Sequence, residues 1–175
     1  MKNLISSIAV IAVLAFSSYL LGGCTPMIMG EKAPDFLTST INGEIFALKD
    51  YVGQQGDNKV LILAFFNTDC KACEEDLRYL QRLYDQYGRD GLDVVCVFTG
   101  NSAKARDRAK RFIQNLDLKL TVVLDENGKI AKGYNVTGVP CQYIVDREGF
   151  VRSKYLGCGD GVKRKIEEHL RTLLS

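Results

Sequence analysis

Two cysteines three residues apart, Cys70 and Cys73, lie between a strand pattern and a helix pattern. Residues 59–66 (KVLILAFF) form a short apolar run, which is typical of a strand covered on both faces. Residues 74–87 instead repeat apolar side chains every three or four positions, as one face of a helix does. A thiol at a helix N-terminus faces the positive end of the helix dipole and unpaired N–H groups, so its pKa should lie below that of a free thiol. The pattern therefore predicts an exposed, attacking Cys70 and a shielded, resolving Cys73.

The remaining sequence continues this alternation of strand and helix patterns. Strands are predicted at 92–99, 118–124, 142–145 and 150–155, and helices at 102–116, 126–134 and 162–174. Ser102 is a candidate N-cap of the first of these helices. An Asn-Gly pair within 41–45 predicts an N-terminal hairpin, and the polar residues 146–149 predict a turn between the last two strands. The order predicts an α/β sandwich whose central sheet is mainly parallel at first and ends in an antiparallel hairpin.

The first 23 residues have the pattern of a secretory signal. Lys2 is followed by residues 4–21, which contain no charge, and the sequence LGGC at 21–24 resembles a bacterial lipobox. We therefore predict cleavage before Cys24 and lipid on its thiol. An uncleaved membrane anchor is the alternative, because about 18 apolar residues are close to the shortest helix that spans a bilayer.

Either form would place the folded part outside the cytoplasm, in the cell envelope and at a membrane face. We predict a tether over 24–30 and a single domain over 31–175, which is large enough to fold without a disulfide scaffold or structural metal. The whole chain has 23 Lys and Arg residues against 21 Asp and Glu residues, a net charge of +2. Because this charge provides no large basic field, no nucleic-acid partner is expected.

The Cys70–Cys73 pair has two less reactive interpretations. A structural zinc ion needs four ligands, but the other candidates form no second close pair, so no metal is expected. Those candidates are Cys96, Cys141, Cys158 and His169. A static structural disulfide is the second alternative, although so short a loop constrains the unfolded chain only a little.

Three further cysteines accompany the pair. Cys96 falls within a strand pattern and is interpreted as a small apolar residue. Cys141 and Cys158 flank the terminal hairpin and could be near enough to form a second disulfide.

Pro140 follows Val139 directly before the first strand of the terminal hairpin. A proline at such a place often marks a cis peptide bond in a tight turn, and a trans proline that opens a strand is the alternative. The order of APDF at 33–36, buried strand, C-x-x-C, helix, GVP at 138–140 and hairpin resembles the thioredoxin-like thiol–disulfide oxidoreductases of the bacterial envelope, of TlpA/ResA type. The resemblance covers about residues 30–174.

The resemblance implies a thioredoxin-like three-layer sandwich with a central mixed sheet, flanking helices and an N-terminal β-hairpin extension. It implies that Cys70 is the nucleophile, that Cys73 resolves, and that a cis Pro140 packs beside their disulfide. Val139 would offer backbone groups to an extended substrate strand. No dissociable cofactor is expected, because the cysteine pair carries the electrons.

Three residues beside the cysteines are further candidates for the site. Lys71 and Ala72, between the two cysteines, are candidate substrate contacts. Family members often carry a glutamate three residues after the second cysteine, where this chain has Asp76, which implies a role in proton transfer. Acidic residues that complement a helix N-terminus are the alternative interpretation of 74–76.

The predicted function is that of a membrane-tethered, extracytoplasmic thiol–disulfide oxidoreductase that reduces protein disulfides. By the resemblance, its partners are a protein substrate, such as an apocytochrome c, and a membrane thiol-reducing donor. The family usually has Trp where this chain has Asp69, and a proline between the cysteines, so the redox potential and the substrate stay open.

Three other functions remain as alternatives. A peroxiredoxin needs Thr three residues before its cysteine, whereas Thr68 lies two residues before Cys70. A copper-delivery module of the same superfold needs a wider cysteine spacing and a histidine before the late hairpin, whereas His169 follows it. The third alternative is a surface-bound adaptor whose thiols are incidental.

Overall fold

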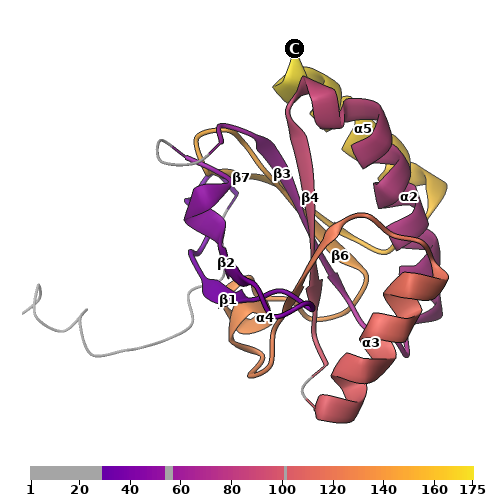
Figure 1. Ribbon diagram of the computed structural model, residues 1–175. Coiled ribbons are helices and arrows are strands. Elements are labelled where there is room, and N and C mark those ends of the chain that lie inside the picture. Colours follow the sequence, from indigo (N-terminus) through magenta and orange to yellow (C-terminus); the bar gives the residue numbers. More distant parts are fainter. Residues whose placement is uncertain (1–28, 54–56, 101) are drawn as a thin grey trace, which may run out of the picture.

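The computed structural model describes residues 29–53, 57–100 and 102–175, drawn in colour in Figure 1. The elements in chain order are β1 (Leu37–Ser39), β2 (Ile45–Ala47), β3 (Val60–Phe66), α2 (Lys71–Tyr87), β4 (Leu92–Phe98), α3 (Ala103–Asn115), β5 (Thr121–Leu124), α4 (Lys129–Gly133), β6 (Cys141–Val145), β7 (Val151–Leu156) and α5 (Asp160–Leu174). The predicted signal over 1–23, the lipid site Cys24 and most of the 24–30 tether lie outside the described residues. Within the described ranges, no helix is both long enough and apolar enough to cross a membrane.

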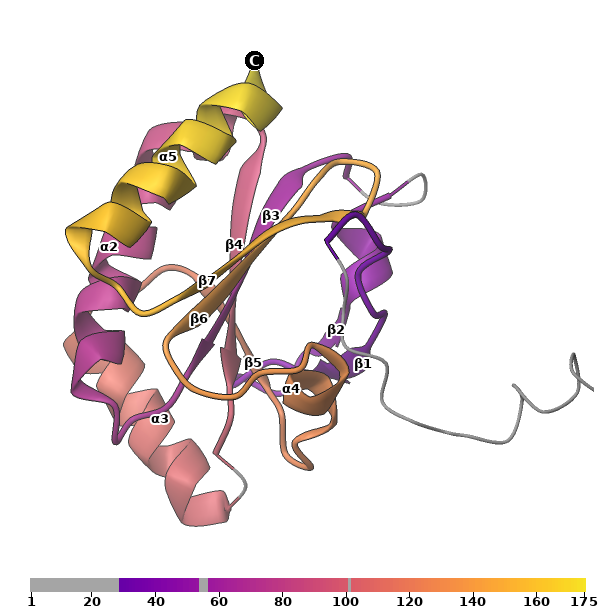
Figure 2. The same cartoon turned by 180° about the vertical axis from the view of Figure 1, so that it is seen from behind.

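Five strands form the central sheet in the order β5-β4-β3-β6-β7. Strands β3, β4 and β5 are parallel, whereas β6 is antiparallel to both β3 and β7. Helices α2, α3 and α5 cover one face of the sheet, and the β1–β2 hairpin and α4 lie on the other (Figures 1 and 2). The three-layer architecture, the mixed sheet and the N-terminal hairpin predicted from the sequence are therefore confirmed.

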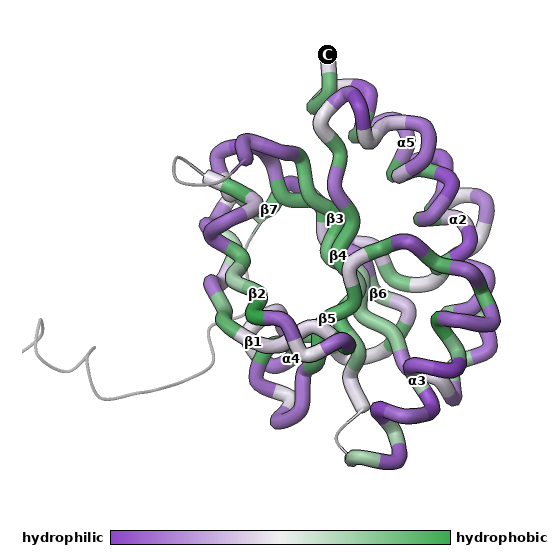
Figure 3. The backbone as a smooth tube through the Cα atoms, viewed as in Figure 1, coloured by the Kyte–Doolittle hydropathy of each residue, from purple (hydrophilic) through white to green (hydrophobic). Residues whose placement is uncertain are grey.

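Strand β3 shows why its sequence is apolar without interruption. All seven of its residues are buried, and they alternate between the two cores of the molecule. Ile62 and Phe66 pack under the helices, whereas Leu61 and Phe65 pack toward the hairpin and α4. Figure 3 shows the resulting apolar centre along β3 and β4. Burial of one such side chain contributes about 1.5–3 kcal/mol, so both faces of this strand stabilise the fold.

The segment before β3 pairs with both outer strands of the sheet. At β5, the backbone N–H of Ile41 donates to the carbonyl oxygen of Val122 at 2.8 Å. At β7, Gly30 donates to the carbonyl oxygen of Val151 at 2.7 Å, and Val151 donates to Glu31 at 2.9 Å. The N-terminal hairpin is thus joined to the sheet by backbone hydrogen bonds as well as by its apolar face.

Several boundaries differ from the sequence prediction for local physical reasons. Helix α2 begins at Lys71 rather than 74, because Cys70 serves as its N-cap. Strand β5 begins at Thr121 rather than 118, since the N–H of Lys119 donates to the side chain of Gln81 at 2.7 Å instead of to a neighbouring strand. The predicted cap of α3 is confirmed: Ser102 Oγ accepts from the N–H of Ala105 at 3.1 Å.

Candidate active site

Cys70 and Cys73 form a disulfide at the N-terminus of α2, where the chain leaves the buried strand β3. Cys70 is half-buried, whereas Cys73 is fully buried. The Sγ atom of Cys70 accepts the backbone N–H of Cys73 at 3.2 Å, in the position of a helix N-cap. In the reduced pair this N–H and the helix dipole would favour a thiolate on Cys70. An approaching sulfur atom can reach Cys70 but not Cys73.

The start of β6 lies beside the disulfide. Strands β3 and β6 are antiparallel neighbours with Phe65 opposite Cys141, so the end of one strand meets the start of the other. The peptide bond between Val139 and Pro140 is cis, in agreement with the geometry expected from the sequence. The carbonyl oxygen of Val139 lies 3.6 Å from Cys70 Sγ. Sheet topology therefore brings together two segments that are about seventy residues apart in sequence.

Asp76 lies on α2, three residues after Cys73, and only 2% of its surface is exposed. Burial raises the pKa of its carboxyl group from 3.8 to about 7, because the charged form loses its hydration. The amide of Gln142 and the ammonium group of Lys163 act in the opposite direction, and Glu75 reinforces the rise. The result is a carboxyl group able to gain and lose a proton near neutral pH.

Gln142 is a buried polar residue of the site that the sequence reasoning did not identify. It stands on β6 opposite the small residue Ala64, and none of its surface is exposed. Its Nε2 donates to the carbonyl oxygen of Gly157 at 3.3 Å. Among the described residues, Gln142 Oε1 and Asp76 Oδ1 have no hydrogen-bond partner. A proton on Asp76 would turn one of these unpartnered acceptors into a donor. The available signal was a glutamine at an inward position of an otherwise apolar strand.

The possible second disulfide is not formed, since Cys141 and Cys158 are both free thiols. Cys141 packs in the core on the hairpin side of the sheet. Cys158 follows β7 on the helix side of the sheet, where burial and the charge of Glu75 raise the pKa of its thiol and the charge of Lys163 lowers it. Their closeness along the hairpin therefore does not bring their sulfur atoms together. Cys96 is buried and its pKa is raised by burial, which agrees with its interpretation as a small apolar residue.

The other candidate residues lie at the surface of the first turn of α2. Lys71 and Ala72 are exposed beside the half-buried Cys70. Asp69, just before them, forms an ion pair with Arg108 of α3, with Oδ2 and Nη2 3.8 Å apart. The sequence reasoning did not identify this pair, because no local pattern relates the loop before α2 to the middle of α3. Among the described residues, no group of three or more His, Cys, Asp or Glu side chains is placed to hold a metal ion.

Comparisons with known proteins agree with this geometry. The model of the AhpC/TSA family matches residues 29–154. The chain is similar to the thiol-disulfide oxidoreductase ResA of Bacillus thuringiensis subsp. konkukian, with 31% identity over 147 residues, covering 84% of this chain and 79% of that protein. It is also 31% identical over 141 residues to the thioredoxin-like protein YneN of Bacillus subtilis, covering 81% of this chain and 78% of that one. A crystal structure from Chlorobium tepidum, provisionally named thiol:disulfide interchange protein DsbE, is 26% identical with a TM-score of 0.76, covering 85% of this chain and 99% of that one.

Proposed function

Because this chain belongs to the AhpC/TSA family and is a thiol–disulfide oxidoreductase of the ResA type, we propose that it reduces disulfides of protein substrates outside the cytoplasm. The observation that carries the proposal is the asymmetric Cys70–Cys73 disulfide at the N-terminus of α2. Cys70 is partly exposed, and Cys73 is fully buried. This asymmetry suits a pair in which one thiol attacks and the other resolves.

The proposed cycle starts from the reduced pair. The Cys70 thiolate attacks one sulfur atom of the substrate disulfide, the substrate S–S bond breaks, and the other substrate sulfur leaves as a thiolate that takes a proton. Cys73 then loses its proton and attacks Cys70 in the mixed disulfide, so the second substrate thiol is released and the Cys70–Cys73 bond forms. Two electrons pass from the pair to the substrate. A membrane thiol-reducing donor must return two electrons before the next cycle.

We assign Asp76 the role of accepting the proton that Cys73 loses. Its place one helical turn after Cys73 and its pKa of about 7 support this role. The titratable groups around it come from several elements: Glu75 and Tyr79 of α2, Cys96 of β4, Cys141 of β6, Cys158 after β7 and Lys163 of α5. Of these groups, Lys163 favours the charged carboxylate and Glu75 opposes it. The rate of the resolving step should therefore rise as pH passes through about 7.

Substrate binding is assigned to the surface around Cys70. The backbone of Val139 would pair with an extended substrate segment, and its carbonyl oxygen already lies close to Cys70 Sγ. Lys71 and Ala72 would contact the same segment from the first turn of α2. The resemblance to TlpA/ResA-type proteins extends the proposal to the cysteines of an apocytochrome c as one class of substrate.

The proposal includes attachment to a membrane. We propose that residues 1–23 are removed and that lipid on Cys24 holds the domain on the outer side of a membrane. The LGGC sequence at 21–24 and the uncharged run before it support this part. The tether would keep the domain close to a membrane-embedded electron donor.

Brief alkylation of the reduced protein at mildly acidic pH, followed by peptide mapping, tests the assigned roles. Cys70 should react first and Cys73 slowly, because only Cys70 is both accessible and stabilised as a thiolate. Cys73→Ser should accumulate a mixed disulfide with a substrate peptide, whereas Cys70→Ser should form none. Faster labelling of Cys73, or mixed disulfides in Cys70→Ser alone, would contradict the assignment.

A further inference from the structure

We propose that one face of α3 is a docking surface for an acidic segment of the protein partner. The surface, here named the α3 basic stripe, consists of Lys104, Arg108 and Arg111. The inference rests on the proposed function, because it specifies the charge of the protein substrate whose disulfide Cys70 and Cys73 reduce.

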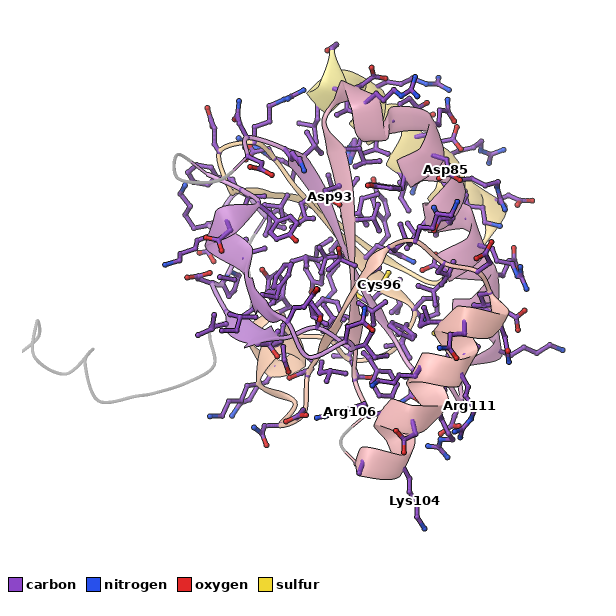
Figure 4. The ribbon with its side chains drawn as sticks, in the orientation of Figure 1. Asp85, Asp93, Cys96, Lys104, Arg106 and Arg111 are labelled. Carbon is purple, nitrogen blue, oxygen red and sulfur yellow. A yellow bond between two sulfur atoms is a disulfide. The ribbon has the colours of Figure 1, made fainter. Side chains whose placement is uncertain are left out.

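The three side chains form a continuous line on one side of the helix. Their positions follow the spacing i, i+4 and i+7, which places them on one face over about 10 Å of helix. All three are exposed, and the buried side of α3 is formed by Ala105 and Ala109. Figure 4 shows Lys104 and Arg111 projecting from α3 away from the sheet. The stripe is therefore a solvent-facing surface.

The positive charge is concentrated on this helix rather than spread over the molecule. Helix α3 contains five Lys or Arg residues and one acidic residue, Asp107, whereas the whole chain has a net charge of +2. Arg106 points away from the stripe and forms an ion pair with Glu126 after β5. Within residues 29–53, 57–100 and 102–175, no ion pair includes Lys104 or Arg111. These two charges remain available to a partner.

The stripe adjoins the accessible sulfur atom. Arg108 Nη2 lies 3.8 Å from the carboxylate of Asp69, the residue directly before Cys70. Both side chains of this ion pair are more than half exposed, so solvent screens the pair and its net contribution is small. A carboxylate of the partner can therefore replace Asp69 at little cost. The middle of the stripe is thus connected to the reactive loop by a contact that exchanges readily.

The occupant is a protein segment rather than a lipid surface because of where the stripe lies. A partner whose sulfur atom bonds to Cys70 comes close to Asp69, the residue directly before it, and to Arg108, which is paired with Asp69. A membrane seated on the same stripe would cover Cys70 and exclude the substrate. Opposite charge on the partner would accelerate encounter, since electrostatic steering raises association rates by about 10- to 1000-fold at low salt.

The test compares three peptides that share one disulfide-closed loop and differ only in flanking Glu, Lys or neutral residues. The full chain, pre-reduced and held in a neutral detergent, is mixed with each peptide in a stopped-flow instrument at 50 mM and 500 mM salt. The Glu peptide should react about tenfold faster than the Lys peptide at low salt. The difference should shrink at high salt, because the Debye length falls well below 10 Å.

Two double variants with the same change in net charge separate the effect of the stripe on the reaction rate from the effect of net charge. Lys104→Glu with Arg111→Glu should slow the Glu peptide about tenfold and leave the neutral peptide unchanged. Lys49→Glu with Arg89→Glu makes the same change at exposed positions outside α3 and should retain the preference for the Glu peptide. Circular dichroism checks that both variants keep the fold.

Each contrary outcome has a distinct meaning. Equal rates for the Glu and Lys peptides, or an equal loss in both variants, would overturn the docking proposal while the proposed function stands. Binding to anionic vesicles that depends on Lys104 and Arg111, with peptide rates unchanged, would assign the stripe to a membrane and also overturn it. Failure of the neutral peptide to react would overturn the proposed function and the docking proposal with it.

Discussion

Replacing Asp76 with Asn should stabilise the oxidised protein at alkaline pH and leave its stability nearly unchanged at acid pH. Burial raises the pKa of the carboxyl group from 3.8 to about 7 in the folded protein. Between these pH values the folded state binds a proton that the unfolded state has released, so the free energy of unfolding falls as pH rises. The contribution of the protonated carboxyl is complete below pH 3.8 and is lost as pH passes through about 7.

The magnitude follows from the difference between the two pKa values. From 3.8 to about 7, at about 1.36 kcal/mol for each pKa unit, the loss is about 4 kcal/mol. Asn has nearly the same size and does not ionise, so the variant avoids this loss. Its amide can also donate to Gln142 Oε1, which has no partner among the described residues. We therefore expect a gain of about 2–4 kcal/mol at pH 8, after imperfect hydrogen bonding is allowed for.

Urea unfolding of the oxidised protein at intervals from pH 4 to pH 8 measures the effect. Asp85→Asn is the matched control, because Asp85 lies on the same helix and is exposed. The difference in the free energy of unfolding between wild type and Asp76→Asn should grow with pH. The difference between wild type and Asp85→Asn should not. A difference that stays flat from pH 4 to pH 8, or a control that follows the same curve, would refute the reasoning. The variant should also slow the resolving step, so it gains stability while it loses activity.

Three further changes have defined outcomes. Gln142→Leu removes the amide that lowers the pKa of Asp76, so the midpoint of the pH–rate profile for disulfide reduction should move to higher pH; an unchanged midpoint would contradict this role. Asp125→Ala removes the carboxylate that accepts two backbone N–H groups at the start of α4, at 3.0 and 2.8 Å, and should lower the free energy of unfolding by about 2 kcal/mol or more in urea titrations. Cys24→Ala should leave an unlipidated precursor by mass spectrometry, whereas an unmodified Cys24 in the mature wild-type protein would exclude the lipid anchor.

The parts of the fold that could be predicted are those in which local sequence and tertiary environment agree. The run 59–66 is apolar at every position because both faces of β3 are buried, and the sequence pattern reports that directly. Ser102 is a good N-cap in isolation and caps α3 in the structure. The reactive pair was predictable for the same reason, since the positions of Cys70 and Cys73 follow from the end of a strand and the start of a helix.

The parts that could not be predicted depend on contacts between distant segments. The environment of Asp76 depends on Gln142, whose side chain faces α2 because β6 pairs with β3 in one register. Strand β5 begins at Thr121 rather than 118 because the side chain of Gln81, on α2, accepts a hydrogen bond from the N–H of Lys119. The hairpin pattern predicted that Cys141 and Cys158 could lie near each other in space, but the side of the sheet that each sulfur faces is a property of the packed molecule.

The backbone hydrogen bonds of the N-terminal segment to Val122 and Val151 have a consequence for the molecule in a crowded solution. An outer strand with open N–H and C=O groups is a template on which another chain can add a strand and begin an aggregate. Here one short segment occupies such groups on β5 and on β7, at opposite sides of the sheet. A newly synthesised domain that has not yet docked residues 30–41 would expose two unpaired strand edges at once. The segment thus protects the domain against self-association. Its removal should cause precipitation before it lowers catalytic activity.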